Sequence, residues 1–403
     1  MKPLSRHALI VGAGIAGQAL ALFLKKAGIA ASLYEARTER GDIGGALQVA
    51  PNGMEVLAAL GLDRRIAGGG MSCDTMVFLN ARGRELSRVN LRNLAPSSLP
   101  AVTLKRADLH RALYDEVLRQ NVPLHFGKKL AGIEDEPDRK IRAVFADGSH
   151  ADGDFLIAAD GLWSRARAHV VPNGPEPHFM GLLGIGGFVP RAALEAFPAF
   201  AEHTMYMMFS PGGFFGFGYA GGDPATGAGW WINPPRATPL TRDEVDAQDS
   251  AQLRAELLAR HRGAAPPVEA LIGATSEIVN VGNIYDVARL PAWHRGRVGL
   301  IGDAAHAVSP NSGQGASLAL EDALVLARLL RGDAPAEQAL AQFEAMRRER
   351  VEKVIAYGRR AGEDKKIEGK IGLWLRDRMV ALAMPWVMRS NRWIYDYRLV
   401  WNE

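Results

Sequence analysis

Residues 302–315 read GDAAHAVSPNSGQG and stand between an apolar run at 298–301 and a helical pattern at 316–323. This order predicts a strand that delivers Asp303 at its end, a loop stiffened by Pro310, and a helix that glycines open. A carboxylate at that point accepts hydrogen bonds from ligand hydroxyls, and free amides at a helix N-terminus attract anionic groups. The stretch therefore predicts a binding site for an anionic ligand that carries hydroxyl groups.

A second binding signature lies near the start of the chain, where a GAGIAG motif begins at Gly12. The apolar periodicity of residues 8–34 predicts a strand, a helix and a second strand around it. Gly12 permits the tight turn, Gly14 lets a pyrophosphate approach the backbone, and Gly17 lets the helix and strand pack closely. Glu35 ends the second strand and is expected to bind ribose hydroxyls. An acidic residue repels a 2′-phosphate, so we expect a dinucleotide without one.

Two further sequence features indicate a function only in combination with these two motifs. Asp160 begins the sequence DGLWSRAR after an apolar run at 155–159, and Arg106 opens a helical pattern at 106–119. An Asp-Gly pair after a strand is usually a turn, and an arginine at a helix start usually lies on the surface. Neither feature alone predicts a function.

Composition and charge narrow the function classes. The 403 residues exceed one ordinary core and predict two interlocked domains. The net charge of +4 is spread along the sequence, so we expect no nucleic-acid partner. The single cysteine, Cys73, excludes an internal disulfide and favours the cytoplasm. We identify no metal-binding cluster and no transmembrane segment, and we interpret the apolar stretch at 8–24 as folded structure.

The predicted fold is α/β with a discontinuous organisation. Segments of βαβ character predict a Rossmann-like nucleotide-binding domain, into which a glycine- and aromatic-rich mixed β-sheet domain for substrate is inserted. The remainder is predicted as a C-terminal helical region. The expected bounds are 1–72, 101–180 and 281–330 for the first domain, 73–100 and 181–280 for the second, and 331–403 for the helical region.

The three motifs at 12–17, 160–167 and 302–315 have an order and separation that resemble the single-component, group A flavoprotein monooxygenases of the para-hydroxybenzoate hydroxylase type. The resemblance implies tightly but non-covalently bound FAD, with NADH or NADPH as a transient reductant. It also implies an NAD(P)H-dependent monooxygenase that hydroxylates a planar aromatic or polycyclic small molecule with O2, through a flavin C4a-hydroperoxide.

The resemblance also implies roles for individual residues. Glu35 would hold the adenosine ribose, Asp303 the ribityl chain, and Asp160 both FAD and the nicotinamide nucleotide. Pro310, Gly313 and Gly315 are the catalytic candidates, because they would lie at the flavin face and at the amides that stabilise the reduced, anionic flavin. The full set of expected cofactor contacts is Gly12, Gly14, Ala16, Gly17, Glu35, Gly45, Ala46, Arg106, Leu130, Asp160, Asp303, Pro310, Gly313, Gly315 and Ala316.

The inserted sheet is expected to form the substrate wall. Its large apolar side chains are spaced to share one face, and no pair of charged residues stands out among them. We therefore expect a largely apolar substrate. The residues predicted for this wall are Met205, Met207, Phe209, Phe215, Phe217 and Trp231.

Several alternatives stay open at this point. An antibiotic-inactivating monooxygenase of the tetracycline type has the same motif order, and a flavin oxidase or reductase without oxygen transfer needs the same cofactor residues. A flavin-binding scaffold without turnover is a further reading. The aromatic and arginine-rich stretch at 372–401 is expected to pack over the two domains rather than lie on a membrane. We expect a monomer or homodimer.

Overall fold

The computed structural model describes residues 6–41, 44–94, 99–135, 140–210, 213–363 and 370–402. A mainly parallel sheet organises the nucleotide-binding half. All neighbouring pairs are parallel except the one between β18 and β19. Its strands lie in the order β18 (His294–Arg295), β19 (Val298–Leu300), β12 (Phe155–Ala158), β1 (His7–Val11), β2 (Ala30–Tyr34) and β8 (Leu124–His125).

Helices bury this sheet, and their sequences reflect it. The first ten residues of the helix after β1 are buried, since it packs against the sheet and against later helices. This explains a helix that is apolar on all sides. The helices of this half are α1 (Ile15–Lys26), α2 (Pro51–Ala59), α3 (Asp63–Gly69), α4 (Arg106–Arg119), α5 (Ala166–Val170), α10 (Asp303–His306), α11 (Gly315–Leu330) and α12 (Ala336–Glu363).

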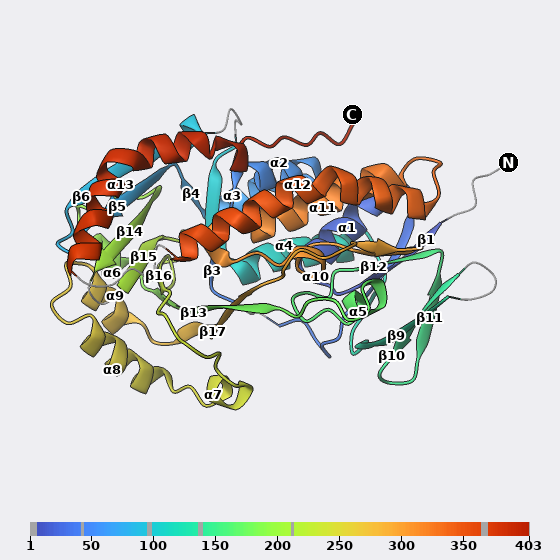
Figure 1. Ribbon diagram of the computed structural model, residues 1–403, viewed down its shortest axis with the longest axis horizontal. Coiled ribbons are helices and arrows are strands. Elements are labelled where there is room, and N and C mark those ends of the chain that lie inside the picture. The colour runs from blue at the N-terminus through green and yellow to red at the C-terminus, as the bar shows by residue number, and fades with distance from the viewer. Residues whose placement is uncertain are drawn as a thin grey trace.

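Two small antiparallel sheets flank the parallel one. The first lies beside the cavity described below, and the second lies at the far end of the molecule (Figure 1). The first has the order β3 (Ala46–Val49), β7 (Ala101–Lys105) and β4 (Met71–Cys73), and the second the order β11 (His150–Gly153), β10 (Ile141–Phe145) and β9 (Leu130–Asp135).

A larger sheet forms the other half of the molecule. Its strand pairs are antiparallel except for β5 with β14. The order is β17 (Ile278–Asp286), β13 (His178–Val189), β16 (Ala228–Ile232), β15 (Gly213–Tyr219), β14 (Thr204–Ser210), β5 (Thr75–Leu79) and β6 (Glu85–Asn90). Four helices accompany it: α6 (Ala192–Glu195), α7 (Arg242–Asp246), α8 (Ser250–Arg260) and α9 (Val268–Ala274).

The C-terminal region crosses both halves. Helix α12 runs from one half to the other, and α13 (Lys370–Ser390) lies along β6 at the end occupied by the large sheet (Figure 1). The chain then returns, and the Trp401 ring stacks on Phe23 of α1 with a centroid separation of 5.2 Å. Within the described residues, no helix combines the length and apolar character needed to cross a membrane.

The α/β class predicted from the sequence is confirmed. Strands that belong to the larger sheet come from residues 75–90, 178–232 and 278–286. This membership supports the proposed discontinuous division, with the sheet reaching a few residues beyond the expected bounds on both sides of the insertion.

Candidate active site

A cavity of about 1340 Å3 lies between the two halves of the molecule. The parallel-sheet half contributes loops to its wall, the large sheet contributes one face, and α12 and α13 contribute side chains. Residues from both ends of the chain therefore meet in one space. Most of the sequence-predicted site residues line it: Gly14, Ala16, Gly45, Ala46, Arg106, Met205, Met207, Phe209, Trp231, Asp303, Pro310, Gly313, Gly315 and Ala316.

The three glycine positions of the first motif are occupied by glycine for different structural reasons. Gly12 adopts φ +100°, and a Cβ there would overlap the carbonyl oxygen of Ala159. A Cβ on Gly17 would overlap the carbonyl oxygen of Gly12, so both positions exclude larger residues. Gly14 has nothing within 4 Å of an added Cβ and faces the cavity. No side chain caps α1 there, which leaves amides at a positive helix end for an anionic group.

Glu35 is held beside this turn. Its Oε2 accepts a hydrogen bond from the amide of Ala13 at 2.8 Å, and its Oε1 accepts one from the amide of Arg37 at 3.0 Å. The amide of Lys128 donates to the Glu35 carbonyl oxygen, so the segment that leads to Leu130 runs alongside. Leu130 is buried at the start of β9, and neither it nor Glu35 lines the cavity itself.

The loop before β3 packs against Arg106. Gly44 has φ +104°, and a Cβ there would lie 2.9 Å from Cδ of Arg106. The Arg106 amide donates to the carbonyl oxygen of Gly45 at 2.9 Å. Gly45, Ala46 and Arg106 all border the cavity, so a cation stands beside the glycine loop that the sequence predicts next to the cofactor.

Asp160 stabilises the turn after β12. Its Oδ2 accepts hydrogen bonds from the amides of Arg165 and Ala166, while its buried Oδ1 has no protein partner. Burial raises the pKa of this carboxyl. Its chain neighbours Ala159 and Gly161 line the cavity, whereas Asp160 itself is not among the lining residues.

Arg167 connects this turn to the loop at 302–315. Its guanidinium is buried and donates to the carbonyl oxygens of Asp303 at 3.0 Å and Ala304 at 2.9 Å. The sequence analysis included Arg167 in a motif without giving it a role. A buried arginine among backbone carbonyls fixes the place where the chain turns towards the cavity.

The loop at 302–315 borders the cavity along much of its length. Asp303 lines the cavity and its side chain is exposed to that space, while desolvation by the surrounding protein raises the pKa of its carboxyl. A short 3-10 helix begins at Pro310, Gly313 adopts φ +63°, and α11 starts at Gly315 without a side-chain cap. The loop therefore presents a carboxylate at one end and free amides at a positive helix end at the other.

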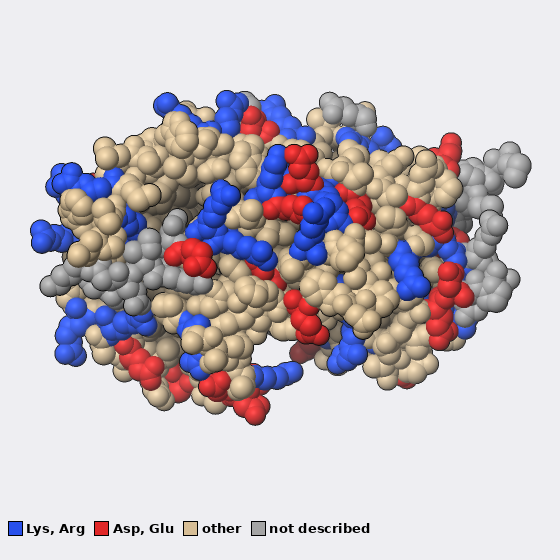
Figure 2. Space-filling view, viewed as in Figure 1, with Lys and Arg blue, Asp and Glu red and all other residues tan. Residues whose placement is uncertain are grey.

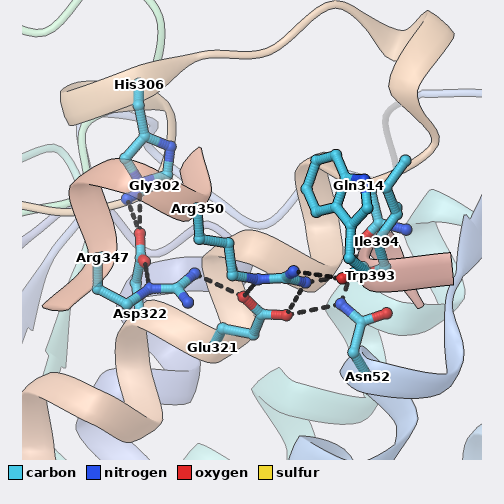
Figure 3. Close-up of polar contacts among 10 residues, drawn as sticks. All are labelled: Asn52, Gly302, His306, Gln314, Glu321, Asp322, Arg347, Arg350, Trp393 and Ile394. Carbon is cyan, nitrogen blue, oxygen red and sulfur yellow. Dashed lines mark hydrogen bonds and ion pairs between the residues drawn. The ribbon is translucent and has the colours of Figure 1, made fainter. Parts of the chain in front are cut away.

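A buried charge network supports the first end of this loop (Figure 3). Asp322 Oδ2 accepts the amide of Gly302 at 2.9 Å and lies 2.6 Å from His306 Nε2. Arg347 Nε donates to Asp322 Oδ1 at 2.9 Å. Burial alone would raise the pKa of Asp322, but His306 and Arg347 outweigh it and hold the pKa below its ordinary value. Sequence reasoning missed this network, although a Glu-Asp pair in an apolar helix was a visible signal.

The same network supports the second end of the loop. Glu321 forms ion pairs with Arg350 Nη2 at 2.7 Å and with Arg347 Nη2 at 2.6 Å. It also accepts a hydrogen bond from Asn52 Nδ2 at 2.6 Å. Asn52 Nδ2 also lies 3.0 Å from Oε1 of Gln314, whose Nε2 is buried without a protein partner at the cavity wall. A series of polar contacts from Arg350 through Glu321 and Asn52 therefore orients Gln314, the residue before α11, at the cavity wall.

Arg350 extends the network to the C-terminal segment. Its guanidinium donates to the carbonyl oxygens of Trp393 at 3.0 Å and Ile394 at 3.1 Å. Trp393 and Tyr395 line the cavity, so the tail and the loop share one support.

The large sheet supplies an apolar wall, with a correction to the prediction. Met207 pairs with Gly216, and Phe209 pairs with Phe214, so the cavity-facing aromatic residue of β15 is Phe214. The prediction that Phe215 and Phe217 share this wall is wrong. They lie opposite Met208 and Tyr206 and belong to the core on the other face. The error comes from the pairing register, because directly paired residues of adjacent strands point to the same face and a shift of one residue places a side chain on the other face.

Glycines on β15 shape this wall. A Cβ at Gly216 would overlap the ring of Trp231, so the indole lies over that position. Within the sequence FFGFG at 214–218, Phe215 and Phe217 therefore lie on the core face, whereas Phe214 lines the cavity and Gly216 lies beneath the Trp231 ring. Further apolar residues that line the cavity include Met76, Phe78, Tyr357, Met384, Val387, Met388, Trp393 and Tyr395.

Comparison with known proteins identifies relatives along nearly the whole chain. A family model described as an FAD binding domain matches residues 6–357. The aurachin C monooxygenase/isomerase of Stigmatella aurantiaca is 32% identical over 376 residues, which covers 93% of both chains. The FAD-dependent urate hydroxylase of Klebsiella oxytoca is 32% identical and covers 88% of both. The crystal structure of Klebsiella pneumoniae HpxO with FAD and uric acid superposes with a TM-score of 0.80 at 29% identity, covering 96% of this chain and 95% of that one.

Proposed function

The chain belongs to the FAD-binding-domain family of group A flavoprotein monooxygenases, and from that premise we propose that it hydroxylates a planar, largely apolar aromatic or polycyclic molecule with O2. The observation that carries the proposal is one continuous cavity, which joins the loop at Asp303 and Pro310 to the apolar face at Met207 and Trp231. A cofactor at the loop and a substrate at the sheet would share this space.

The residues present fit FAD. Gly12 and Gly17 make a turn that a side chain would close, and the uncapped α1 supplies amides for the pyrophosphate. Glu35 and Leu130 would face the adenosine, Asp160 would stand behind the pyrophosphate, and Arg106 would meet the cofactor from the side. The buried, unpartnered Gln314 Nε2 is a further donor at the cavity wall.

Bound FAD supplies the redox chemistry with O2. The protein contributes position and charge. Asp303 would accept hydrogen bonds from the ribityl hydroxyls, and the free amides of Gly315 and Ala316 at the positive end of α11 favour negative charge beside them. Pro310 would lie at the flavin face, on the side of the cavity that faces the large sheet. The apolar wall of that sheet would exclude water from the reacting region.

We also propose NADH or NADPH as the reductant, and a cytoplasmic monomer or homodimer as the working form. The acidic Glu35 disfavours a 2′-phosphate on the tightly bound dinucleotide and does not select the reductant. Reduction of the purified, FAD-loaded protein by each nucleotide under anaerobic conditions separates the two.

Turnover with a panel of aromatic compounds tests the function directly. We expect nucleotide consumption that rises with substrate, and a product whose mass increases by one oxygen atom. Hydrogen peroxide equal to the nucleotide consumed, without such a product, would indicate an oxidase instead. Oxygenation of tetracycline alone would favour the antibiotic-inactivating alternative, and a purified chain that does not bind FAD would contradict the proposal.

A further inference from the structure

Helix α13 has two faces of similar chemistry but different surroundings. Val380 and Met388 are buried against β5, β6 and the C-terminal segment, and Met384 lines the cavity. This inner face packs over the sheet, as the sequence analysis expects for the C-terminal region. The outer face is also apolar, and nothing in the described structure covers it.

The outer face forms a continuous apolar stripe. Its six large side chains are between 51% and 82% exposed. Their spacing follows the helical period, so they lie in one line about 22 Å long. An exposed patch of this kind marks an interaction surface. We call it the α13 stripe; it consists of Ile371, Trp374, Leu375, Met379, Leu382 and Trp386.

Positive charge accompanies the stripe. Arg378 and Arg389 are exposed on the same side of the helix, and Arg378 lies over the Trp374 ring at 5.4 Å. The one acidic residue of α13, Asp377, is paired with Arg376. In Figure 2 the surface at the place of α13 is mainly tan, with blue groups beside it.

This positive charge distinguishes between two possible partners of the stripe, a second copy of the chain and an anionic phospholipid surface. A symmetric contact with a second copy would bring the same arginines of both chains together, which is unfavourable. An anionic phospholipid surface would instead attract them, while tryptophan and aliphatic side chains enter the acyl boundary. The cavity lies directly beneath, since Met384, Val387 and Met388 of the same helix line it.

We propose that the α13 stripe docks this protein on an anionic phospholipid surface. Helix α13 then lies in the plane of the membrane interface, with its inner face over the cavity. An apolar molecule dissolved in the bilayer would have to pass only this helix to reach the cavity.

Vesicle flotation of the intact, FAD-loaded protein tests the proposal. Vesicles made of equal parts phosphatidylcholine and phosphatidylglycerol should bind the protein, and added salt should weaken the binding. Vesicles of phosphatidylcholine alone should bind it less. The measurement needs no turnover, so its result is independent of the proposed hydroxylation.

Substitutions on the stripe sharpen the test. The double substitution Leu382→Glu with Trp386→Glu should weaken partitioning by at least about tenfold, because two apolar anchors are lost and two negative charges are added. Leu118→Glu is the matched control, since Leu118 is an exposed leucine on α4 away from the stripe. Arg378→Gln with Arg389→Gln should remove the preference for phosphatidylglycerol.

A spectroscopic measurement covers the case in which the double variant misfolds. Acyl-brominated phosphatidylglycerol should quench the tryptophan fluorescence of the wild-type protein, and less so that of Trp374→Phe with Trp386→Phe. Equal flotation of the stripe and control variants, absence of binding to anionic vesicles, or a lipid-independent dimer that the stripe substitutions dissociate would each overturn the proposal.

Discussion

At one end of the cavity, the loop from Asp303 to Gly315 rests on a layer of buried charges; at the other, β14 and β15 present methionine and aromatic side chains backed by a second apolar core. The first end depends on hydrogen-bond geometry, which tolerates little displacement. The second depends on packing, and methionines there can adapt to different shapes. The contrast suggests that one end is built to hold one cofactor and the other to accommodate variation in substrate.

Arg347→Met is expected to lower the free energy of unfolding more than any other substitution proposed below, because it removes the ion pairs that support the loop at 302–315. Glu321 and Asp322 are fully buried, and Arg347 is paired with both. Removing one partner of a buried ion pair typically costs about 3–5 kcal/mol. Urea unfolding should show this loss together with lower FAD content, whereas Arg242→Met, at an exposed arginine, should change stability by less than about 0.5 kcal/mol. Equal stability of the two variants would contradict a structural role for the network.

Phe215→Ala and Phe214→Ala should have different effects on stability and on KM, because the two residues lie on opposite faces of the large sheet. Phe215 is buried in the core away from the cavity, so its truncation should cost about 3–5 kcal/mol with little change in KM. Phe214 borders the cavity, so its truncation opens no new enclosed void and should cost roughly 1.5–3 kcal/mol. Its main effect should be on the KM for substrate. The reverse pattern would show that the pairing register in solution differs.

Asp303→Asn should separate stability from cofactor binding. Desolvation by the surrounding protein raises the pKa of Asp303, so the folded chain holds this proton more tightly than the unfolded chain. Ionisation above the ordinary value of 3.8 therefore disfavours the folded state, and the penalty is complete once the pH exceeds the raised pKa. At neutral pH the variant apoprotein should have a higher Tm than wild type, and FAD binding should weaken at least about tenfold. Unchanged FAD affinity would remove Asp303 from the cofactor site.

Met207→Leu should have the smallest effect. The two side chains have similar volumes, so stability should change by less than about 1.5 kcal/mol, and FAD content should stay the same. The branched and stiffer leucine should alter the relative kcat/KM values of substrates that differ in width. If all substrates change alike, Met207 does not contact them selectively.

The sequence predicted the nucleotide-binding half well because its signals are local. The helix at 106–119 has the expected bounds, and the predicted strand, helix and strand are all present within residues 7–34, since apolar periodicity and turn glycines act within one element. The wall of the large sheet was predicted only in part. Which of Phe214 and Phe215 faces the cavity depends on pairing between strands, and no single strand contains that information.

Other features required contacts between distant segments. The helices α7, α8 and α9 within residues 242–274 were not predicted, because the strands expected in the insertion end before this stretch and no element was assigned to it. The role of Arg350 depends on Glu321 and on the carbonyl groups of residues 393 and 394, which only the folded chain brings together. The pairing that supports the loop is therefore tertiary in origin.

The return of the chain to its own beginning has a consequence for biosynthesis. Trp401 stacks on Phe23 of α1, and β19 pairs with β12 beside β1. On a ribosome that adds 5–20 residues per second, roughly 20–80 s separate the synthesis of Gly12 from that of Trp401. During that interval the glycine turn exists without the strand, loop and tail that complete its surroundings. The surroundings of the glycine turn are therefore complete only after the strand β19, the loop at 302–315 and the segment around Trp401 have been synthesised.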